Sequence, residues 1–258
     1  YWGWGYENSG IDADQTKTLL ETFAEGFGIN PANDGAFPAL DAIDLPAARL
    51  EAPAKLYGVC TSDTHDRVVH AFGQSQPDSI RIFRGDFAHA PDIIAYPESS
   101  EDIQEIYDWA GDKGAAVIPW GAGSSVVGGV TSDVGSGYNG VISVDMGRMN
   151  KVLEVDEVSR AARIQGGARG PELEAQLKPH GLTLRHFPQS FEHSTFGGWV
   201  ATRSGGHFAT LYTHIDDFVE SLRTVTPVGT MESRRLPGSG AGPSPDRMMI
   251  GSEGALGI

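Results

Sequence analysis

The sequence predicts an α+β protein in which a βαβ unit precedes a strand-rich part and follows a mostly helical or irregular region. Three observations lead to this fold class. Apolar strand-like runs flank one amphipathic helix between residues 91 and 119, strand-like runs dominate after residue 140, and residues 1–88 show neither pattern. Glycine-rich runs punctuate the second half, at 119–129, 194–206 and 251–257.

The N-terminal region, residues 1–88, opens with a segment rich in Trp, Gly and Tyr. Helices are expected at 16–27 and 63–72, the second because Val68, Val69 and Phe72 share one helical face. The stretch between them is rich in Pro, Ala and Asp, which is typical of a loop. We expect this region to pack as an appendage on a larger body formed by residues 89–258.

The βαβ unit begins with an apolar run at 93–96. A helix then starts at Ser99 or Ser100 and ends at Gly114, because hydroxyls cap helix starts and glycine favours helix ends. Its apolar residues recur at helical spacing and are Ile103, Ile106, Tyr107 and Ala110. A strand at 116–119 completes the unit, and its two strands should be parallel with a right-handed crossover.

The second part continues with strands. They are expected at 141–144, 152–155 and 161–165, and Pro171 then begins a helix that runs to residue 178. Another strand pair surrounds a turn that contains Pro227 and Gly229. Residues 89–258 therefore divide into two subdomains, at about 89–155 and 156–258. The segment 236–245 contains many Gly, Pro and Ser residues and indicates a flexible loop.

Composition narrows the classes of partner. The net charge of −15 and the isoelectric point near 4.8 disfavour nucleic acid and anionic membranes. The single cysteine, Cys60, rules out an intramolecular disulfide and is interpreted as a buried apolar thiol. No run of about 20 apolar residues and no signal peptide is present, so a cytoplasmic protein is expected.

The first glycine run follows a strand, where open α/β sheets usually bind ligands. Gly121 and Gly123 begin a dinucleotide fingerprint, but Val126 occupies its third glycine position. The lysine of a triphosphate-binding loop is also missing. A tight turn that carries Ser124 and Ser125 remains, and an ordinary strand-to-helix turn stays open as the alternative.

The second run combines a dense set of hydroxyls with two glycine pairs, and each hydroxyl could also serve as a cap or turn former. The hydroxyl residues are Ser190, Ser194, Thr195, Thr202 and Ser204. Five histidines lie nearby, at positions 180, 186, 193, 207 and 214, but their spacing matches no compact metal motif. No metal is expected. A GxSxG elbow and a reactive cysteine context are both absent from the sequence.

In order along the chain, these motifs resemble the FAD-binding domain of the vanillyl-alcohol oxidase superfamily. The resemblance rests on PDIIAYPESSEDI, VIPWGAGSS, the GGA turn at 166–168 and GSEGALG, and it covers about residues 91–258. PQSFEHSTFGGWVATRSGG extends it to the alkyldihydroxyacetonephosphate synthase family, as do the N-terminal segments YWGWGY and DRVVHAFGQS. It implies a two-subdomain PCMH-type FAD-binding fold, with a C-terminal cap domain missing from this sequence.

The resemblance implies four segments that contact FAD, to which we add a glycine pair. They are Pro119, Trp120, Gly121, Ala122, Gly123, Ser124 and Ser125; Pro188, Gln189, Ser190, Phe191, Glu192, His193 and Ser194; Gly197 and Gly198; Thr202, Arg203, Ser204 and Gly205; and Gly251, Ser252, Glu253, Gly254, Ala255, Leu256 and Gly257. At Ala122 the family commonly has glycine, so a left-handed backbone there would be strained. The first run holds no histidine for a covalent tether, and we expect non-covalent FAD.

The activity implied is the exchange of the acyl group of acyl-dihydroxyacetone phosphate for a fatty alcohol, in ether-lipid synthesis. Two alternatives stay open: an FAD-linked oxidoreductase acting on a 2-hydroxy acid or related alcohol, and a non-catalytic binding domain. The family's catalytic residues lie mainly in the cap, so none is assigned. The expected partner is a small-molecule or lipid substrate; a homodimer stays open, as does peripheral membrane contact through parts outside this sequence.

Overall fold

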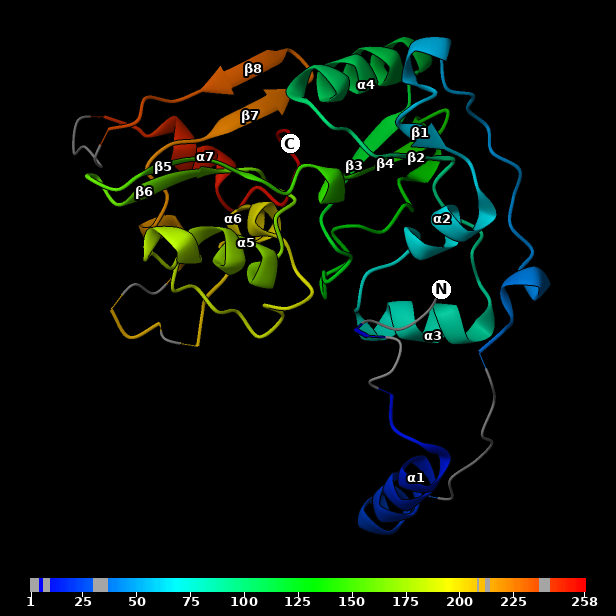
Figure 1. Ribbon diagram of the computed structural model, residues 1–258. Coiled ribbons are helices and arrows are strands. Elements are labelled where there is room, and N and C mark those ends of the chain that lie inside the picture. The colour runs from blue at the N-terminus through cyan, green and yellow to red at the C-terminus, as the bar shows by residue number, and fades with distance from the viewer. Residues whose placement is uncertain (1–4, 7–9, 30–36, 208, 212–213, 237–241) are drawn as a thin grey trace.

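The computed structural model describes residues 5–6, 10–29, 37–207, 209–211, 214–236 and 242–258 (Figure 1). One half is built on a four-stranded sheet in the order β1-β2-β4-β3. These strands are β1 (Cys60–Thr61), β2 (Ile93–Ala95), β3 (Ala116–Trp120) and β4 (Val141–Asp145). β4 pairs in parallel with both β2 and β3 and therefore lies between the two strands of the predicted βαβ unit.

The other half contains two antiparallel strand pairs and three helices, which lie on the opposite side of Figure 1. The strands are β5 (Val152–Asp156), β6 (Ala161–Ile164), β7 (Arg223–Thr226) and β8 (Gly229–Glu232). The helices are α5 (Gly170–Leu177), α6 (Phe196–Thr202) and α7 (Pro245–Met249). Together the two halves give the predicted α+β fold.

Helix α4 (Ser100–Lys113) forms because its sequence supplies both ends and a buried face. Ser99 and Asp102 make a reciprocal capping box at the start, and Gly114 adopts a left-handed conformation (φ 64°) at the end. The four residues predicted to line its inner face are all buried. On that face Ile106 and Ala110 pack into the core of the first sheet.

Helix α4 also joins the two halves. Ile103 and Tyr107 pack with Met149 and with Val225 of β7 in a second buried cluster. Val225 exchanges two backbone hydrogen bonds with Ile258, at 2.7 and 2.8 Å, and Ile258 packs against this cluster and the first-sheet core. The two halves therefore share packed side chains along α4.

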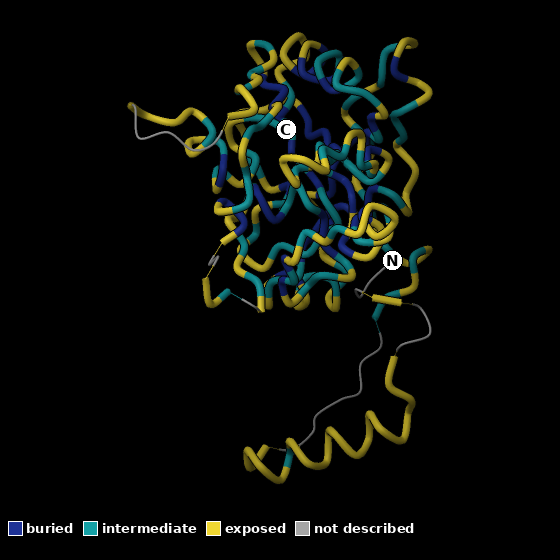
Figure 2. The backbone as a smooth tube through the Cα atoms, turned by 60° about the vertical axis from the view of Figure 1, so that its left-hand side comes forward, coloured by how far each residue is buried: buried dark blue, intermediate teal, exposed yellow. Residues whose placement is uncertain are grey.

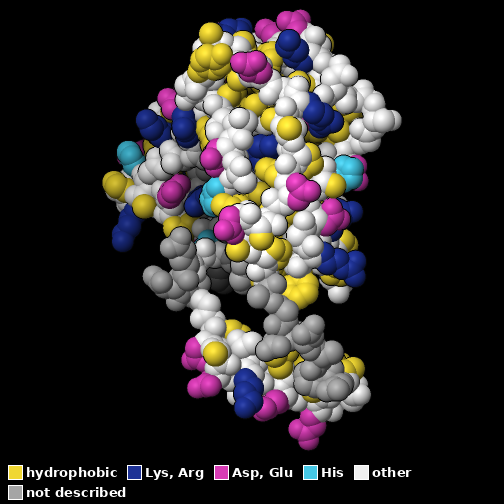
Figure 3. Space-filling view, turned by 90° about the vertical axis from the view of Figure 1, so that its right-hand side faces the viewer, with side chains coloured by type: hydrophobic (Ala, Val, Ile, Leu, Met, Phe, Trp, Pro, Cys, Tyr) yellow, Lys and Arg dark blue, Asp and Glu magenta, His cyan; other side chains and the backbone are white. Residues whose placement is uncertain are grey.

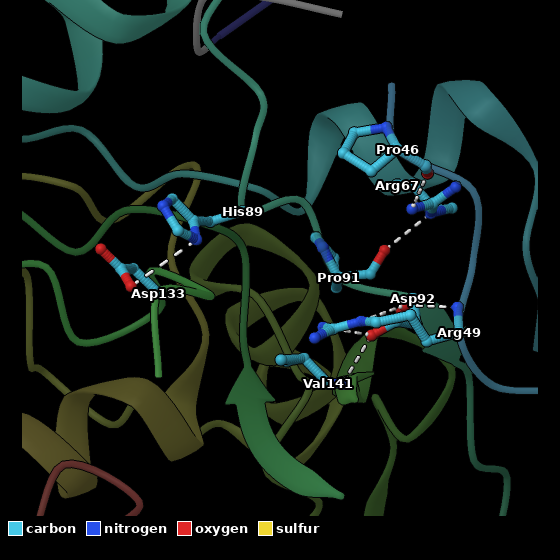
Figure 4. Close-up of polar contacts among 8 residues, drawn as sticks. All are labelled: Pro46, Arg49, Arg67, His89, Pro91, Asp92, Asp133 and Val141. Carbon is cyan, nitrogen blue, oxygen red and sulfur yellow. Dashed lines mark hydrogen bonds and ion pairs between the residues drawn. The ribbon is translucent and has the colours of Figure 1, made fainter. Parts of the chain in front are cut away.

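The part of the N-terminal region after residue 37 is built into the first sheet rather than only packed on it. Strand β1 pairs with β2 in antiparallel register, and Leu56 is buried in the core of the sheet. Arg49 forms a bidentate ion pair with buried Asp92, with N–O distances of 3.0 and 2.7 Å (Figure 4). Burial opposes ionisation of Asp92, but hydrogen bonds from Arg49 and Val141 outweigh it and lower the pKa of the carboxyl.

Arg67 in α2 (Thr64–Val69) adds a second attachment of the same region. It is 5% exposed, and its guanidinium donates to the carbonyls of Pro91 and Pro46 at 2.7 and 2.8 Å (Figure 4). Neither Pro46 nor Pro91 belongs to a helix or a strand. Arg67 thereby links the N-terminal region to the start of the first subdomain.

Helix α1 (Ala13–Phe27) has no buried residue and projects away from the rest of the chain (Figures 1 and 2). Phe23 and Phe27 stack on each other with ring centroids 6.0 Å apart, and both remain exposed. Among the described residues, no helix is long and apolar enough to cross a membrane. Acidic and basic side chains are interspersed over the face shown in Figure 3.

Several predicted elements differ in extent from those observed. The helix predicted at 63–72 ends at Val69, and a further helix, α3 (Gln76–Arg84), follows it. The strands β5 to β8 lie where the sequence indicated strands. Helix α6 falls within the second glycine run, where no helix was predicted. Part of the predicted flexible segment, 237–241, lies outside the described residues.

Candidate functional site

A cavity of about 1260 Å³ lies between the two halves of the chain. Its walls come from the end of β3, the β5-β6 pair, the start of α6 and the loop before Ile258. Residues from all three glycine runs meet there, although the first and third runs are more than 120 residues apart in sequence. The volume exceeds the range of about 300–1,000 Å³ that is usual for small-molecule pockets.

The first run leaves β3 at Trp120, which is only 5% exposed and whose surface lines the cavity. Gly123 has a φ of 68°, and a Cβ there would lie 2.5 Å from the Trp120 ring. Glycine is therefore required at 123 both by conformation and by space. Ala122 is not among the residues with positive φ, so alanine is tolerated without strain at this position.

Several glycines that were predicted to approach a ligand approach protein instead. A Cβ at Gly121 would collide with the Thr195 hydroxyl, and one at Gly254 would lie 2.7 Å from Pro119. A Cβ at Gly197 would lie 2.8 Å from the carbonyl oxygen of Gly166. The absence of side chains thus lets the three runs pack against one another and against the neighbouring GGA turn around the cavity.

The second run forms helix α6. The hydroxyl of buried Thr195 caps it by accepting from the Gly198 amide at 3.3 Å. Ser194 accepts from the Trp199 indole at 2.6 Å and donates to the Ser190 carbonyl at 2.7 Å. The hydroxyls of Ser194 and Thr195 therefore make structural hydrogen bonds, as expected from the alternative that the sequence hydroxyls act as caps and turn formers. Both residues also line the cavity.

The third run is a chain of left-handed turns. Gly251, Glu253 and Gly254 have φ values of 82°, 52° and 82°. A Cβ at Gly251 would lie 2.5 Å from Arg203. Arg203 itself pairs with buried Asp216 at 2.7 Å, and Arg247 pairs with the same carboxylate at 3.0 Å. Arg203 has a structural partner and does not line the cavity.

The structure brings part of the predicted set together at the cavity. The predicted residues that line it are Pro119, Trp120, Gly121, Ala122, Gly123, Ser124, Ser125, Ser190, Ser194, Gly197, Gly198, Thr202, Ser204, Ser252, Glu253, Gly254 and Gly257. Those that do not are Pro188, Gln189, Phe191, Glu192, His193, Arg203, Gly205, Gly251, Ala255 and Leu256.

All six residues from Pro188 to His193 line a separate cavity of about 300 Å³, which is also lined by His207. Pro188 is buried, Gln189 is exposed, and the ring of His193 lies 4.9 Å from that of Tyr6. Ser190 lines both cavities. Within this segment, Ser190 is therefore the residue that can contact a ligand in the main cavity.

Five arginines line the main cavity of this acidic chain. They are Arg160, Arg163, Arg185, Arg223 and Arg235. Arg163 and Arg235 pair with Glu232 and Glu154 at 3.3 and 2.6 Å. Arg160 and Arg185 have no ion pair among the described residues, and both have left-handed backbones. The cavity therefore offers cationic groups for an anion.

Histidines do not line the main cavity in the described part of the chain. His186 is buried behind it, with Nε2 2.8 Å from the Ser204 hydroxyl, and burial lowers the pKa of its imidazole. No group of three or more His, Cys, Asp or Glu residues suited to a metal is found among the described residues.

The cavity fits an extended dinucleotide such as FAD. It is walled by both halves, is lined by glycines at positions 121, 123 and 198, and carries hydroxyls together with arginine side chains. Main-chain amides and arginines are the donors that phosphate oxygens need. The fold and this site define a dinucleotide-binding α+β protein of two subdomains.

A family described as FAD binding domain matches residues 91–233, more than half of the chain, and the chain belongs to that family. FAD is therefore its cofactor. The alkyldihydroxyacetonephosphate synthase of Dictyostelium discoideum is 46% identical over 192 residues, covering 74% of this chain and 31% of the relative. The D-lactate dehydrogenase of Anaerostipes hadrus is 30% identical over 170 residues, covering 65% of this chain and 34% of the relative.

A solved structure of alkyldihydroxyacetonephosphate synthase superposes with a TM-score of 0.80 at 36% identity. The superposition covers 93% of this chain and 45% of the synthase chain. The chain spans about a third of the length of the curated relatives it matches. These comparisons confirm the predicted PCMH-type FAD-binding fold.

Other cavity residues escaped prediction because they carry no local signal. Gly166 belongs to the GGA turn that the sequence had already singled out, and the others include the strand residues of β6, Met149 and the segment from Val219 to Thr224. They are ordinary strand and loop residues in sequence. Helix α6 could have been found from Thr195 as a cap followed by Phe196, Trp199 and Val200 at helical spacing. Non-covalent attachment of FAD stays a prediction.

Proposed function

We propose that this chain is the FAD-binding part of an enzyme that exchanges the acyl group of acyl-dihydroxyacetone phosphate for a fatty alcohol. The extent of similarity carries the proposal. The solved synthase structure covers 93% of the chain, which is more than residues 91–258 alone could supply. Similarity to the synthase thus reaches into the N-terminal region, whereas the match to D-lactate dehydrogenase covers 65% of the chain.

Two arginines at the cavity wall support a phosphorylated substrate or cofactor, although seven acidic residues line the cavity beside its five arginines. Arg160 and Arg185 lie at its wall without a carboxylate partner among the described residues, although the chain carries a net charge of −15. Guanidinium groups bind phosphate through paired hydrogen bonds. When bound, FAD supplies the ring at which the substrate carbon reacts. The residues of this chain that line the cavity would hold that cofactor.

A second candidate is an FAD-linked oxidoreductase that acts on a 2-hydroxy acid or related alcohol, and the similarity to a D-lactate dehydrogenase favours it. The two reactions differ in electron balance. The exchange releases a fatty acid and takes up an alcohol without net oxidation, whereas the oxidation removes two electrons from the substrate. The substrate in either case is a small molecule, and in the exchange reaction it is a lipid.

The test uses the purified full-length protein, loaded with FAD, and incubates it with acyl-dihydroxyacetone phosphate and a long-chain alcohol. The proposal expects fatty acid release and ether product in equal amounts, while visible flavin absorbance is retained without oxygen. Anaerobic bleaching by a 2-hydroxy acid, with no exchange product, supports the oxidoreductase instead. Protein that neither binds FAD nor gains thermal stability from it contradicts both enzymes and favours a non-catalytic binding domain.

A further inference from the structure

The segment from His70 to Gln74, between α2 and α3, lies directly against the first glycine run. The Gln74 amide donates to the Ser125 carbonyl at 2.6 Å. A Cβ on Gly73 would collide with the same carbonyl oxygen and would lie 3.1 Å from Val130. Gly73 is outside the left-handed region, so space and not backbone conformation requires glycine there.

His70 supports the same run at its other end. It is 3% exposed, and its ring lies 4.7 Å from the ring of Trp120. Nε2 is 2.9 Å from an Asp145 carboxylate oxygen, and Nδ1 is 2.7 Å from the Asp66 carbonyl, so both ring nitrogens are held. The Trp120 ring in turn fills the space beside Gly123. His70 therefore packs on Trp120, and Trp120 packs on the turn at Gly123.

The segment is itself anchored. Val68, Ala71 and Phe72 are buried with Phe87 and Ala90 in a separate apolar cluster of the N-terminal region. None of the residues from His70 to Gln74 lines the main cavity, so they do not contact a ligand bound there. They also precede residue 91, where the match to the FAD-binding family begins.

We propose that His70, Gly73 and Gln74 are positioning residues that fix the first glycine run in the conformation that binds FAD. A hydrogen bond at Ser125 and a ring contact at Trp120 restrain both ends of a turn that glycine would otherwise leave free. The N-terminal region is in this respect part of the cofactor site. The inference rests on the placement of FAD in the main cavity.

The test compares Gly73→Ala with Gly58→Ala. Gly58 lies in the same region and has no positive φ, and a Cβ there would meet no atom within 4 Å, so its variant is the matched control. A Cβ on Gly73 displaces the Ser125 carbonyl and with it the first glycine run, so Gly73→Ala should raise the Kd for FAD about tenfold and alter the visible circular dichroism of the bound flavin. Gly58→Ala should leave both unchanged.

A purely structural role for Gly73 would lower the unfolding temperature of the FAD-free protein while leaving Kd and the flavin spectrum as in the wild type. That result overturns the proposal. If Gly73→Ala does not fold, His70→Ala is tested in its place, because it removes the ring contact with Trp120. An increased Kd for FAD supports the proposal, and an unchanged Kd overturns it. Wild-type protein that fails to bind FAD would instead refute the cofactor site, and variants that bind like wild type refute only the positioning role.

Discussion

Glycine residues at this site act in two different ways. Gly123 and Gly251 adopt backbone conformations that other residues rarely adopt and also lack room for a Cβ, whereas Gly73, Gly121 and Gly197 have ordinary conformations and lack only the room. Sequence cannot separate the two causes, because both appear as the same letter. Gly198 differs from both groups, since a Cβ there would meet only the Thr195 hydroxyl, at 3.1 Å, and the residue lines the cavity.

Gly198→Trp should abolish FAD binding, because an indole at that position would extend from α6 into the cavity. Equilibrium binding followed by flavin fluorescence measures the effect. Gly137→Trp is the control, since Gly137 has open space around it and does not line the cavity.

Ser125→Trp approaches the cavity from the first run and should give the same loss if Gly198→Trp does not fold. Stoichiometric FAD retained by a folded variant of either kind would show that the cofactor lies elsewhere.

Among the elements, α4 contacts both halves of the chain. Its inner face packs on the first sheet, while Ile103 and Tyr107 pack with Val225 of β7. Its sequence signals were strong: hydroxyl cap, acidic first turn, apolar residues at helical spacing and a closing glycine. Helix α6 shows the opposite case. Its two glycines disfavour helix by about 1 kcal/mol each, and it forms because Thr195 caps it and Trp199 and Val200 are buried.

Ser99→Ala should lower the free energy of unfolding by about 1 kcal/mol, because the α4 capping box loses its hydroxyl acceptor. Urea unfolding followed by far-ultraviolet circular dichroism measures the change. Ser99→Asp keeps an acceptor at the same position and should restore most of the stability. Equal losses in the alanine and aspartate variants would contradict the capping role.

Across the protein as a whole, the N-terminal region is attached through β1, Leu56 and the ion pair between Arg49 and Asp92. Asp92 is 1% exposed and accepts hydrogen bonds from Arg49 and from the Val141 amide. A buried carboxylate with that many donors is costly to replace, because its partners then lose their acceptor.

Asp92→Ala should therefore destabilise the protein by about 3 kcal/mol, as measured by urea unfolding. Glu98→Gln is the control, because Glu98 pairs with Arg148 at 3.0 Å on the surface, where such pairs contribute about 0–1 kcal/mol. If Asp92→Ala lowers the free energy of unfolding no more than Glu98→Gln does, the ion pair does not help to attach the N-terminal region.

The pKa of Asp92 also sets a pH dependence. Because this pKa is lower in the folded protein than its ordinary value of 3.8, the stabilisation is fully present above pH 3.8 and is lost as the pH falls through the folded value. Asp92→Ala should remove that part of the acid dependence, and unfolding curves recorded down the acid range would show it.

Sequence alone was enough to predict the strands β2 to β8 in order with helices α4 and α5 among them, the α4 caps, the three glycine runs and the family, but not β1, α3, α6 or α7. These are local signals, contained in about ten neighbouring residues each. Tertiary packing was needed to establish which residues of each run reach the cavity, that Arg203 pairs with Asp216, and that the segment from His70 to Gln74 supports the first run. Those contacts join parts of the chain whose proximity depends on the packing of the whole fold, and no short stretch of sequence contains them.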